Sequence, residues 1–201
     1  GANGRTRFLA FQARYHGDTF ATMAVCDPEE GMHALLPGTL PAPSVIALPR
    51  DEDSIAAFDK FLNEHADELA GILVEPLVQG AGGMIFHDET VLQTLRAGAD
   101  EHDLLLIFDE IFVGFGRTAA MFACDGAGVR PDIITLGKGL TGGTLPLAAT
   151  IASKKIFETF FSEDPMHALM HGPTYMGNAL ACAAAIRRFK RSSCRACLAA
   201  K

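Results

Sequence analysis

The stretch Leu104–Arg117, LLLIFDEIFVGFGR, indicates both the fold of this chain and the place of its chemistry. It opens on a short apolar run, which is typical of a strand buried on both faces of a parallel sheet. Two carboxylates, Asp109 and Glu110, end that run, and a glycine-rich turn follows. Because ligands of open α/β sheets bind at the carboxyl ends of the strands, we expect Asp109 to face a ligand.

An ionised aspartate at the end of a buried strand is costly unless a cation or a hydrogen-bond donor accompanies it. A protonated pyridine nitrogen is such a partner, and an aspartate beside it lets the ring act as an electron sink. Two simpler roles fit the segment equally well: Asp109 caps the next helix, or it pairs with Arg117.

The rest of the chain alternates between strand-like and helix-like segments. Apolar runs bounded by turn residues recur at Arg7–Gln12, Gly71–Glu75, Ile133–Leu136 and Ala148–Ala152. Apolar residues at helical spacing fall in Asp53–Ala70, Asp88–His102 and the beginning of Ala179–Phe189. This alternation predicts an α/β fold with a mostly parallel sheet flanked by helices. Asp27–Pro49 holds five prolines and is predicted to be a long surface excursion.

Composition narrows the class of protein. The chain has 201 residues, of which 49% are hydrophobic, which suits one domain, or one domain and a fragment of another. A net charge of −7 argues against nucleic-acid or anionic-membrane surfaces, and no apolar run approaches the roughly 20 residues of a membrane span. The five cysteines lack metal-finger spacing, and Gly1–Arg7 carries no secretory signal. We therefore expect reduced thiols, no metal site and a cytoplasmic location.

A second candidate site lies in Asp132–Gly143, DIITLGKGLTGG. Here Lys138 comes just after a predicted strand and has a glycine on each side. A lysine in such a place can form a Schiff base if its surroundings lower its pKa. An exposed lysine in a turn is the commoner outcome for this residue type. A nucleotide-binding loop is disfavoured because no Ser or Thr directly follows the lysine.

Two further segments offer ligand contacts. Tyr15 and His16 follow the first predicted strand, and Tyr15 offers an aromatic face for a flat cofactor, while His16 or Asp18 offers polar groups. Later, Gly172-Pro173 forces a turn after which Thr174 presents a hydroxyl suited to a phosphate oxygen. Taken singly, each segment is equally compatible with an ordinary turn and a helix cap.

Taken together and in this order, the segments resemble the class III pyridoxal-phosphate (PLP) aminotransferases. The likeness rests on YHGDT, ILVEPLVQGAGGM, FDEIFVGFGRT, PDIITLGKGLTGG and HGPTYMGN. It implies the large domain of the fold-type I PLP-dependent transferases over residues 1–186, incomplete at both ends, and a basic tail at 187–201. The sequences of Ala24–Pro28, of HGPT-x-MGN and of Leu180–Ala185 resemble those of family members in biotin synthesis that use S-adenosylmethionine as amino donor.

The resemblance also implies roles for single residues. Lys138 would hold PLP as a Schiff base and move the proton between the substrate Cα and the cofactor. Asp109 would pair with the pyridine nitrogen, and Tyr15 and Ile111 would lie on the two faces of the ring. Thr174 would reach the phosphate of a neighbouring subunit's cofactor, which implies a homodimer with a shared site.

The remaining roles are looser implications of the same resemblance. His16 and Pro173 would contact the cofactor, and Glu75, Asp18 and Gly172 would lie toward the small-molecule substrate. Two other functions stay open at this point: a class III aminotransferase for a different ω-amine or amino acid, and a truncated chain that keeps the fold without catalysis.

Overall fold

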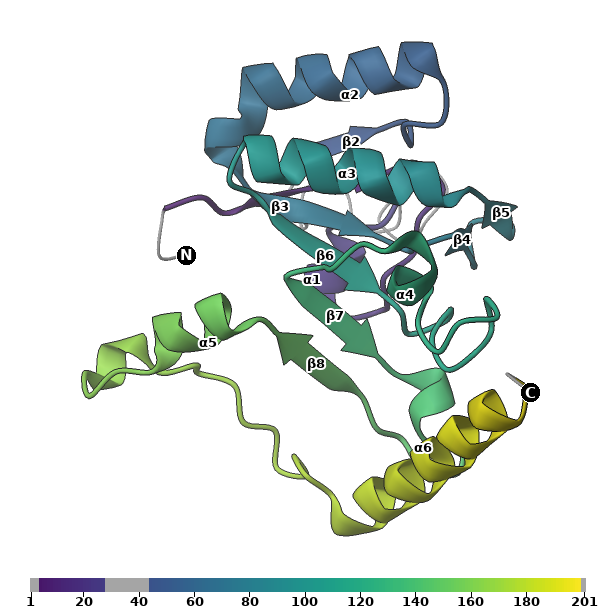
Figure 1. The fold of residues 1–201 in the computed structure, drawn as a ribbon. Helices are drawn as coiled ribbons and strands as arrows, with labels where there is room; N and C mark the ends of the chain where they lie inside the picture. Colours follow the sequence, from purple (N-terminus) through teal and green to yellow (C-terminus); the bar gives the residue numbers. More distant parts are fainter. Residues whose placement is uncertain (1–3, 28–43, 200–201) are drawn as a thin grey trace.

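The structure, a computed structural model, describes residues 4–27 and 44–199, with the backbone alone for 191–199. Its centre is a six-stranded sheet with the strand order β2-β1-β3-β6-β7-β8 (Figure 1). The strands are β1 (Arg7–Phe11), β2 (Ser44–Ile46), β3 (Leu69–Val74), β6 (Leu105–Asp109), β7 (Ile133–Leu136) and β8 (Ala149–Ala152). All neighbouring pairs are parallel except β7 with β8, which is antiparallel. The predicted α/β class with a mostly parallel sheet is confirmed.

Two long helices, α2 (Glu52–His65) and α3 (Glu89–Glu101), lie together on one side of the sheet (Figure 1). Asp51 caps α2 by accepting from the Ser54 backbone N–H at 2.8 Å, and the Ser54 hydroxyl accepts from the Asp51 N–H at 3.0 Å. Such a reciprocal cap satisfies N–H groups that the first turn leaves without partners. The buried residues of the two helices are Phe58, Leu62, Val91, Leu92, Leu95, Gly98 and Ala99.

The core lies between these helices and the sheet. Leu106 and Phe108 of β6 and Ile72 of β3 are fully buried there. On the other face of these strands Leu73, Leu105 and Ile107 are only partly buried, so the predicted burial of both faces is not complete in this chain.

The smaller elements lie around the sheet. They are α1 (Phe20–Met23), α4 (Ala123–Ala127), α5 (Lys154–Phe160), α6 (Ala179–Ala199), and the hairpin of β4 (Val78–Gln79) and β5 (Ile85–Phe86). The described residues also form short 3-10 helices at Ala66–Glu68, Lys138–Leu140 and Pro165–His167. In Figure 1, α5 and α6 lie apart from α2 and α3, beyond the β8 edge. None of the helices in the described ranges is both long and apolar enough to span a membrane.

Two segments differ from the expectation. The strand β2 (Ser44–Ile46) lies in the stretch Asp27–Pro49, so the expectation of a long surface excursion is wrong for these residues. Residues 28–43 of the same stretch fall outside the described part. The predicted helix Ala179–Phe189 continues to Ala199 and passes residue 187 without a break. The division of the chain into 1–186 and 187–201 stays a prediction.

Candidate active site

A cavity of about 480 Å³ opens at the carboxyl edge of the parallel strands. It gathers six of the residues singled out in the sequence: Tyr15, His16, Glu75, Asp109, Ile111 and Lys138. These side chains follow four different strands, β1, β3, β6 and β7, whose ends meet because the strands are parallel. Segments distant in the sequence thus form one site.

Asp109, the last residue of β6, is held by contacts from three segments. Its Oδ2 lies 2.7 Å from His16 Nδ1, and its Oδ1 accepts from the Ile111 backbone N–H at 3.1 Å and the Thr135 hydroxyl at 3.3 Å. Only 7% of Asp109 is exposed. The three contacts fix the carboxylate in one orientation at the cavity wall.

His16 reaches Asp109 from the turn after β1. Because a carboxylate can only accept hydrogen bonds, Nδ1 is the nitrogen that carries the proton in this pair. The other ring nitrogen, Nε2, is buried and has no hydrogen-bond partner among the described residues. Asp109 is therefore the hydrogen-bond partner that orients the imidazole among the described residues.

Arg14 anchors the turn that carries Tyr15 and His16. Its buried guanidinium donates to the backbone carbonyls of Phe11, Val25 and Cys26. Burial lowers the pKa of Arg14 to about 10. Sequence reasoning missed this residue, since a single arginine beside a motif gives no sign that it is buried.

Glu75, which follows β3, joins two loops of the cavity wall. Its Oε1 accepts from the Tyr15 backbone N–H at 3.0 Å, and its Oε2 accepts from the Gly80 N–H at 2.8 Å. Burial raises the pKa of this carboxyl. Both oxygens are engaged by backbone, so Glu75 supports the site in this structure, and its contact with a substrate stays a prediction.

The glycine-rich stretch after Glu75 is explained by a close backbone approach. A Cβ on Gly82 would lie 1.7 Å from the Ala13 carbonyl oxygen, a separation that no side chain tolerates. The stretch packs directly against the turn after β1, and its residues Gly80 and Ala81 form part of the cavity wall.

Tyr15 lines the cavity, whereas Asp18 does not. The Tyr15 hydroxyl donates a hydrogen bond to the exposed Asp18 carboxylate. That hydrogen bond raises the pKa of Tyr15 to about 12. Asp18 therefore orients the ring of Tyr15 from outside the cavity.

Lys138 is the first residue of the 3-10 helix that follows β7, and its side chain is exposed at the cavity. Its Nζ lies 5.6 Å from the centroid of the Phe112 ring. A Cβ on Gly139 would lie 2.8 Å from Phe115, so the residue after the lysine must be small. The lysine is presented by a turn whose backbone is packed tightly.

Glu110 does not join Asp109 in the cavity. It is fully buried, and its carboxylate accepts from the backbone N–H groups of Ala123 at 2.8 Å and Cys124 at 3.0 Å. Burial raises the pKa of this carboxyl. Neighbouring residues of an extended chain point to opposite sides, which separates the two acids. Glu110 ties the loop after β6 back to the strand end.

The segment with Gly172, Pro173 and Thr174 is not brought to the cavity of this chain. All three residues are exposed, and none of them lines the cavity. Their roles toward a neighbouring subunit stay predictions. Among the described residues, no three His, Cys, Asp or Glu side chains are grouped so that they could hold a metal ion.

Five lining residues were not singled out from the sequence: Gly17, Gly80, Ala81, Met84 and Phe112. All belong to motifs that were quoted, and each stands within nine positions of a predicted strand end. These residues could have been predicted if every residue shortly after a predicted strand, and not only the polar ones, had been taken as a candidate.

Comparison with known proteins identifies the family of this chain. Residues 1–193 match the family model described as "Aminotransferase class-III". The chain is 49% identical over 190 residues to adenosylmethionine-8-amino-7-oxononanoate aminotransferase of Mycobacterium leprae, covering 92% of this chain and 43% of that protein.

Two solved structures share the fold. The enzyme of that same name from Methanocaldococcus jannaschii has a TM-score of 0.88 and 34% identity, over 96% of this chain and 45% of that one. A PLP-bound amine transaminase from an uncultivated Pseudomonas species has a TM-score of 0.87 and 33% identity, over 96% and 46%. The chain thus spans less than half the length of these relatives. It belongs to the class III aminotransferase family.

Proposed function

We propose that this chain binds PLP in the 480 Å³ cavity and forms the cofactor-binding part of an aminotransferase. The observation that carries the proposal is that an acid, Asp109, and an amine, Lys138, line the same cavity from the ends of neighbouring strands. An aromatic residue, Tyr15, and an aliphatic one, Ile111, line it as well. These four side chains are of the kinds that would contact a flat heteroaromatic ring.

The donor set suits this cofactor. When bound, PLP supplies an electron sink for the carbanion that forms at the substrate Cα. Asp109 is nearly buried and fixed by three hydrogen bonds, so its negative charge would favour a protonated pyridine nitrogen beside it. Lys138 offers the amine needed to bond covalently to the cofactor's aldehyde carbon.

Three side chains of the protein would then have different roles. His16 donates from Nδ1 to Asp109 and keeps that carboxylate facing the cavity. Lys138 Nζ would hold the cofactor and would serve as the base that moves the proton at the substrate Cα. Glu75 would keep Tyr15 and the glycine-rich wall in place.

For the whole protein we propose transfer of an amino group from S-adenosylmethionine to 8-amino-7-oxononanoate, a step of biotin biosynthesis. The support is the name shared by the M. leprae and M. jannaschii proteins. The second candidate is transamination of another ω-amine, which the similarity to an amine transaminase at nearly the same TM-score favours.

A donor comparison separates the two candidates. The chain, joined to the flanking segments of a full-length relative, is loaded with PLP and offered S-adenosylmethionine or a simple ω-amine, and the loss of PLP absorbance is followed. We expect faster conversion with S-adenosylmethionine. Equal rates with both donors would contradict the biotin-pathway assignment and support the second candidate.

We also propose that the protein works as a cytoplasmic homodimer. The segment around Thr174 exposes large apolar side chains, among them Met170 at 79% and Tyr175 at 79%. A second copy covering this segment would bring Thr174 toward its own cofactor site. Sedimentation equilibrium tests the assembly, and a monomer at every concentration would remove the proposed role of Thr174.

A further inference from the structure

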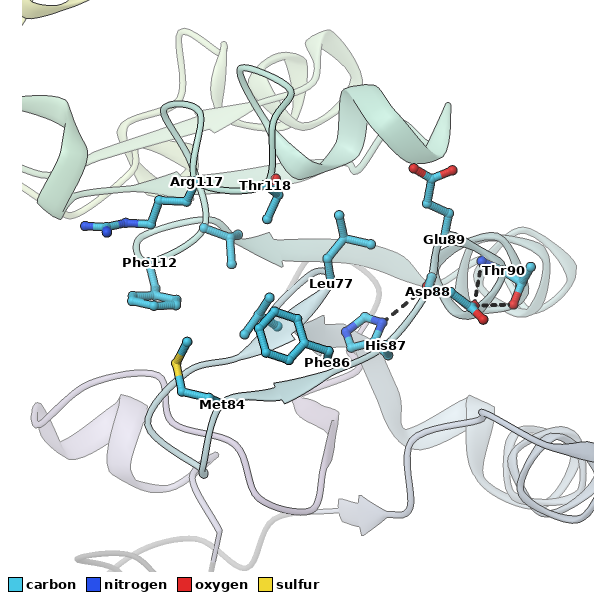
Figure 2. Close-up of a pocket in the computed structure, with 12 residues that line it drawn as sticks. Leu77, Met84, Phe86, His87, Asp88, Glu89, Thr90, Phe112, Arg117 and Thr118 are labelled. Carbon is cyan, nitrogen blue, oxygen red and sulfur yellow. Dashed lines mark hydrogen bonds between the residues drawn. The ribbon is translucent and has the colours of Figure 1, made fainter.

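A second cavity, of about 920 Å³, adjoins the first. Six apolar residues form much of its wall: Leu77, Val78, Met84, Phe86, Phe112 and Val113. Met84 and Phe112 also line the inner cavity that holds Lys138. In Figure 2 these two side chains lie near one another at the same end of the outer cavity. The inner and outer cavities therefore meet at Met84 and Phe112.

Phe112 is the more rigid of the two boundary residues. Its ring packs over Gly80, where an added Cβ would lie 2.9 Å from ring carbon Cδ1. Two cations also lie near the ring: Lys138 Nζ at 5.6 Å and Arg117 Cζ at 5.1 Å from the centroid. Lys138 belongs to the inner cavity and Arg117 to the outer one. Met84, in contrast, is 49% exposed and has a flexible side chain.

We propose that Phe112 is a specificity-determining residue, whose ring limits how far the aliphatic chain of an amine or carbonyl substrate extends from Lys138 into the outer cavity. The proposal rests on the proposed function for its choice of substrate. Apolar walls such as Leu77, Phe86 and Val113 favour methylene groups over water. A smaller residue at position 112 would join the two cavities and let a longer chain reach those walls.

The test uses the chain as it exists and needs no cofactor. Straight-chain aldehydes from propanal to octanal are coupled to lysines with cyanoborohydride, and labelling at Lys138 is measured by peptide mass spectrometry. We expect Phe112→Ala to raise the octanal-to-propanal ratio at Lys138 by roughly tenfold, the order that one or more newly buried methylenes provide. An unchanged ratio would overturn the proposal.

Two internal controls make the ratio specific. Phe86→Ala removes an apolar ring that lines only the outer cavity, and we expect it to leave the ratio at Lys138 unchanged or lower. Lys60 on α2, with a side chain 75% exposed, reports the general reactivity of each aldehyde. A rise at Lys138 in both variants, or an equal rise at Lys60, would count against a role particular to Phe112.

Further substitutions protect the test against misfolding. If circular dichroism shows that Phe112→Ala does not fold, Phe112→Leu is expected to give a smaller rise, and Phe112→Trp a fall below the wild-type ratio. Wild-type ratios in both of these variants would overturn the proposal.

The outcomes also distinguish this inference from the proposed function. If PLP fails to bond to Lys138 and the aldehyde ratio still shifts in Phe112→Ala, the proposed function fails and the role of Phe112 stands. If PLP bonds to Lys138 and the ratio does not shift, the role of Phe112 fails alone.

Discussion

Residues 69–136 and residues 149–189 of this chain differ in how far their large apolar side chains are buried. In the first region, Leu106 and Phe108 are completely buried, and most of the cavity wall lies within it or beside it. In the second, Phe161 is 77% exposed and Met166 is 80% exposed. In the first region Met84 and Phe86 are the exposed large apolar residues among many buried ones, whereas the second region presents apolar surface that one chain does not cover.

The buried polar groups differ in the same way. Asp109, Glu110 and Glu75 each hold backbone or side-chain donors within the first region or with the turn after β1. The described side chains of the second region supply no lining residue to the inner cavity. The wall of the inner cavity is thus formed outside the second region, and that region is expected to contribute Thr174 to the site of a second chain.

The largest expected effect compares one substitution in the two regions. Leu106→Ala in β6 should lower the unfolding free energy by about 2–5 kcal/mol, because it leaves a cavity in the core. Leu169→Ala, at a position that is 63% exposed, should change it by less than about 0.5 kcal/mol in the monomer. Urea denaturation at low protein concentration measures both. Equal losses would show that the two regions are packed alike.

A somewhat smaller effect is expected for the cofactor. Asp109→Asn removes the charge opposite the pyridine nitrogen but keeps the shape of the side chain. Since hydrogen bonds to charged groups contribute about 1.5–3 kcal/mol, PLP affinity should fall roughly 10- to 100-fold in an absorbance titration. Asp53→Asn, on the exposed first turn of α2, is the matched control and should leave the affinity unchanged. Similar affinities for all three proteins would remove Asp109 from the site.

Glu110 gives a pH-dependent prediction. Glu110→Gln keeps one acceptor but turns an NH2 group toward a backbone N–H, which should cost about 1–3 kcal/mol of unfolding free energy. Burial raises the folded-state pKa of Glu110, so its stabilising contribution is complete below the unfolded pKa and is lost as the pH rises through the folded pKa. The gap between wild type and variant should therefore narrow with rising pH. A gap that widens over that window would contradict this assignment.

The smallest effects are expected for ion pairs. Lys154→Ala breaks the exposed pair with Glu158, 3.4 Å apart on α5, and should cost less than about 0.5 kcal/mol. Arg96→Ala removes a pair with Asp132 at 2.9 Å that is only about one-fifth exposed, and should cost more. Thermal unfolding of the two variants side by side measures the difference. A larger loss of stability in Lys154→Ala than in Arg96→Ala would contradict the difference in burial between the two regions.

The strands were predictable because each of them is a short apolar run in the sequence, bounded by turn residues. Leu104–Asp109 anticipated β6 and Ile133–Leu136 matched β7. Strand β2 was missed since Ser44–Ile46 is short and follows a proline-rich stretch, and its pairing with β1 is a long-range contact. Local pattern does not report such contacts.

The candidate site was predictable only in part. Tyr15, Asp109 and Lys138 were found because motif residues at strand ends converge in a parallel sheet. The sequence did not predict that Asp109 lines the cavity while Glu110 binds backbone N–H groups away from it. That difference depends on which side of the chain each side chain faces. The buried Arg14 was also missed, since its partners are backbone carbonyls that leave no mark in the sequence.

The most direct test of the account is whether PLP bonds to Lys138 in preference to other lysines. The chain is incubated with PLP, reduced with borohydride and mapped by peptide mass spectrometry, alongside Lys138→Ala. We predict a single major label on Lys138 that disappears in the variant without moving to Lys154, whose side chain is 86% exposed. Labelling spread evenly over exposed lysines, or identical absorbance spectra for the two proteins, would contradict the account.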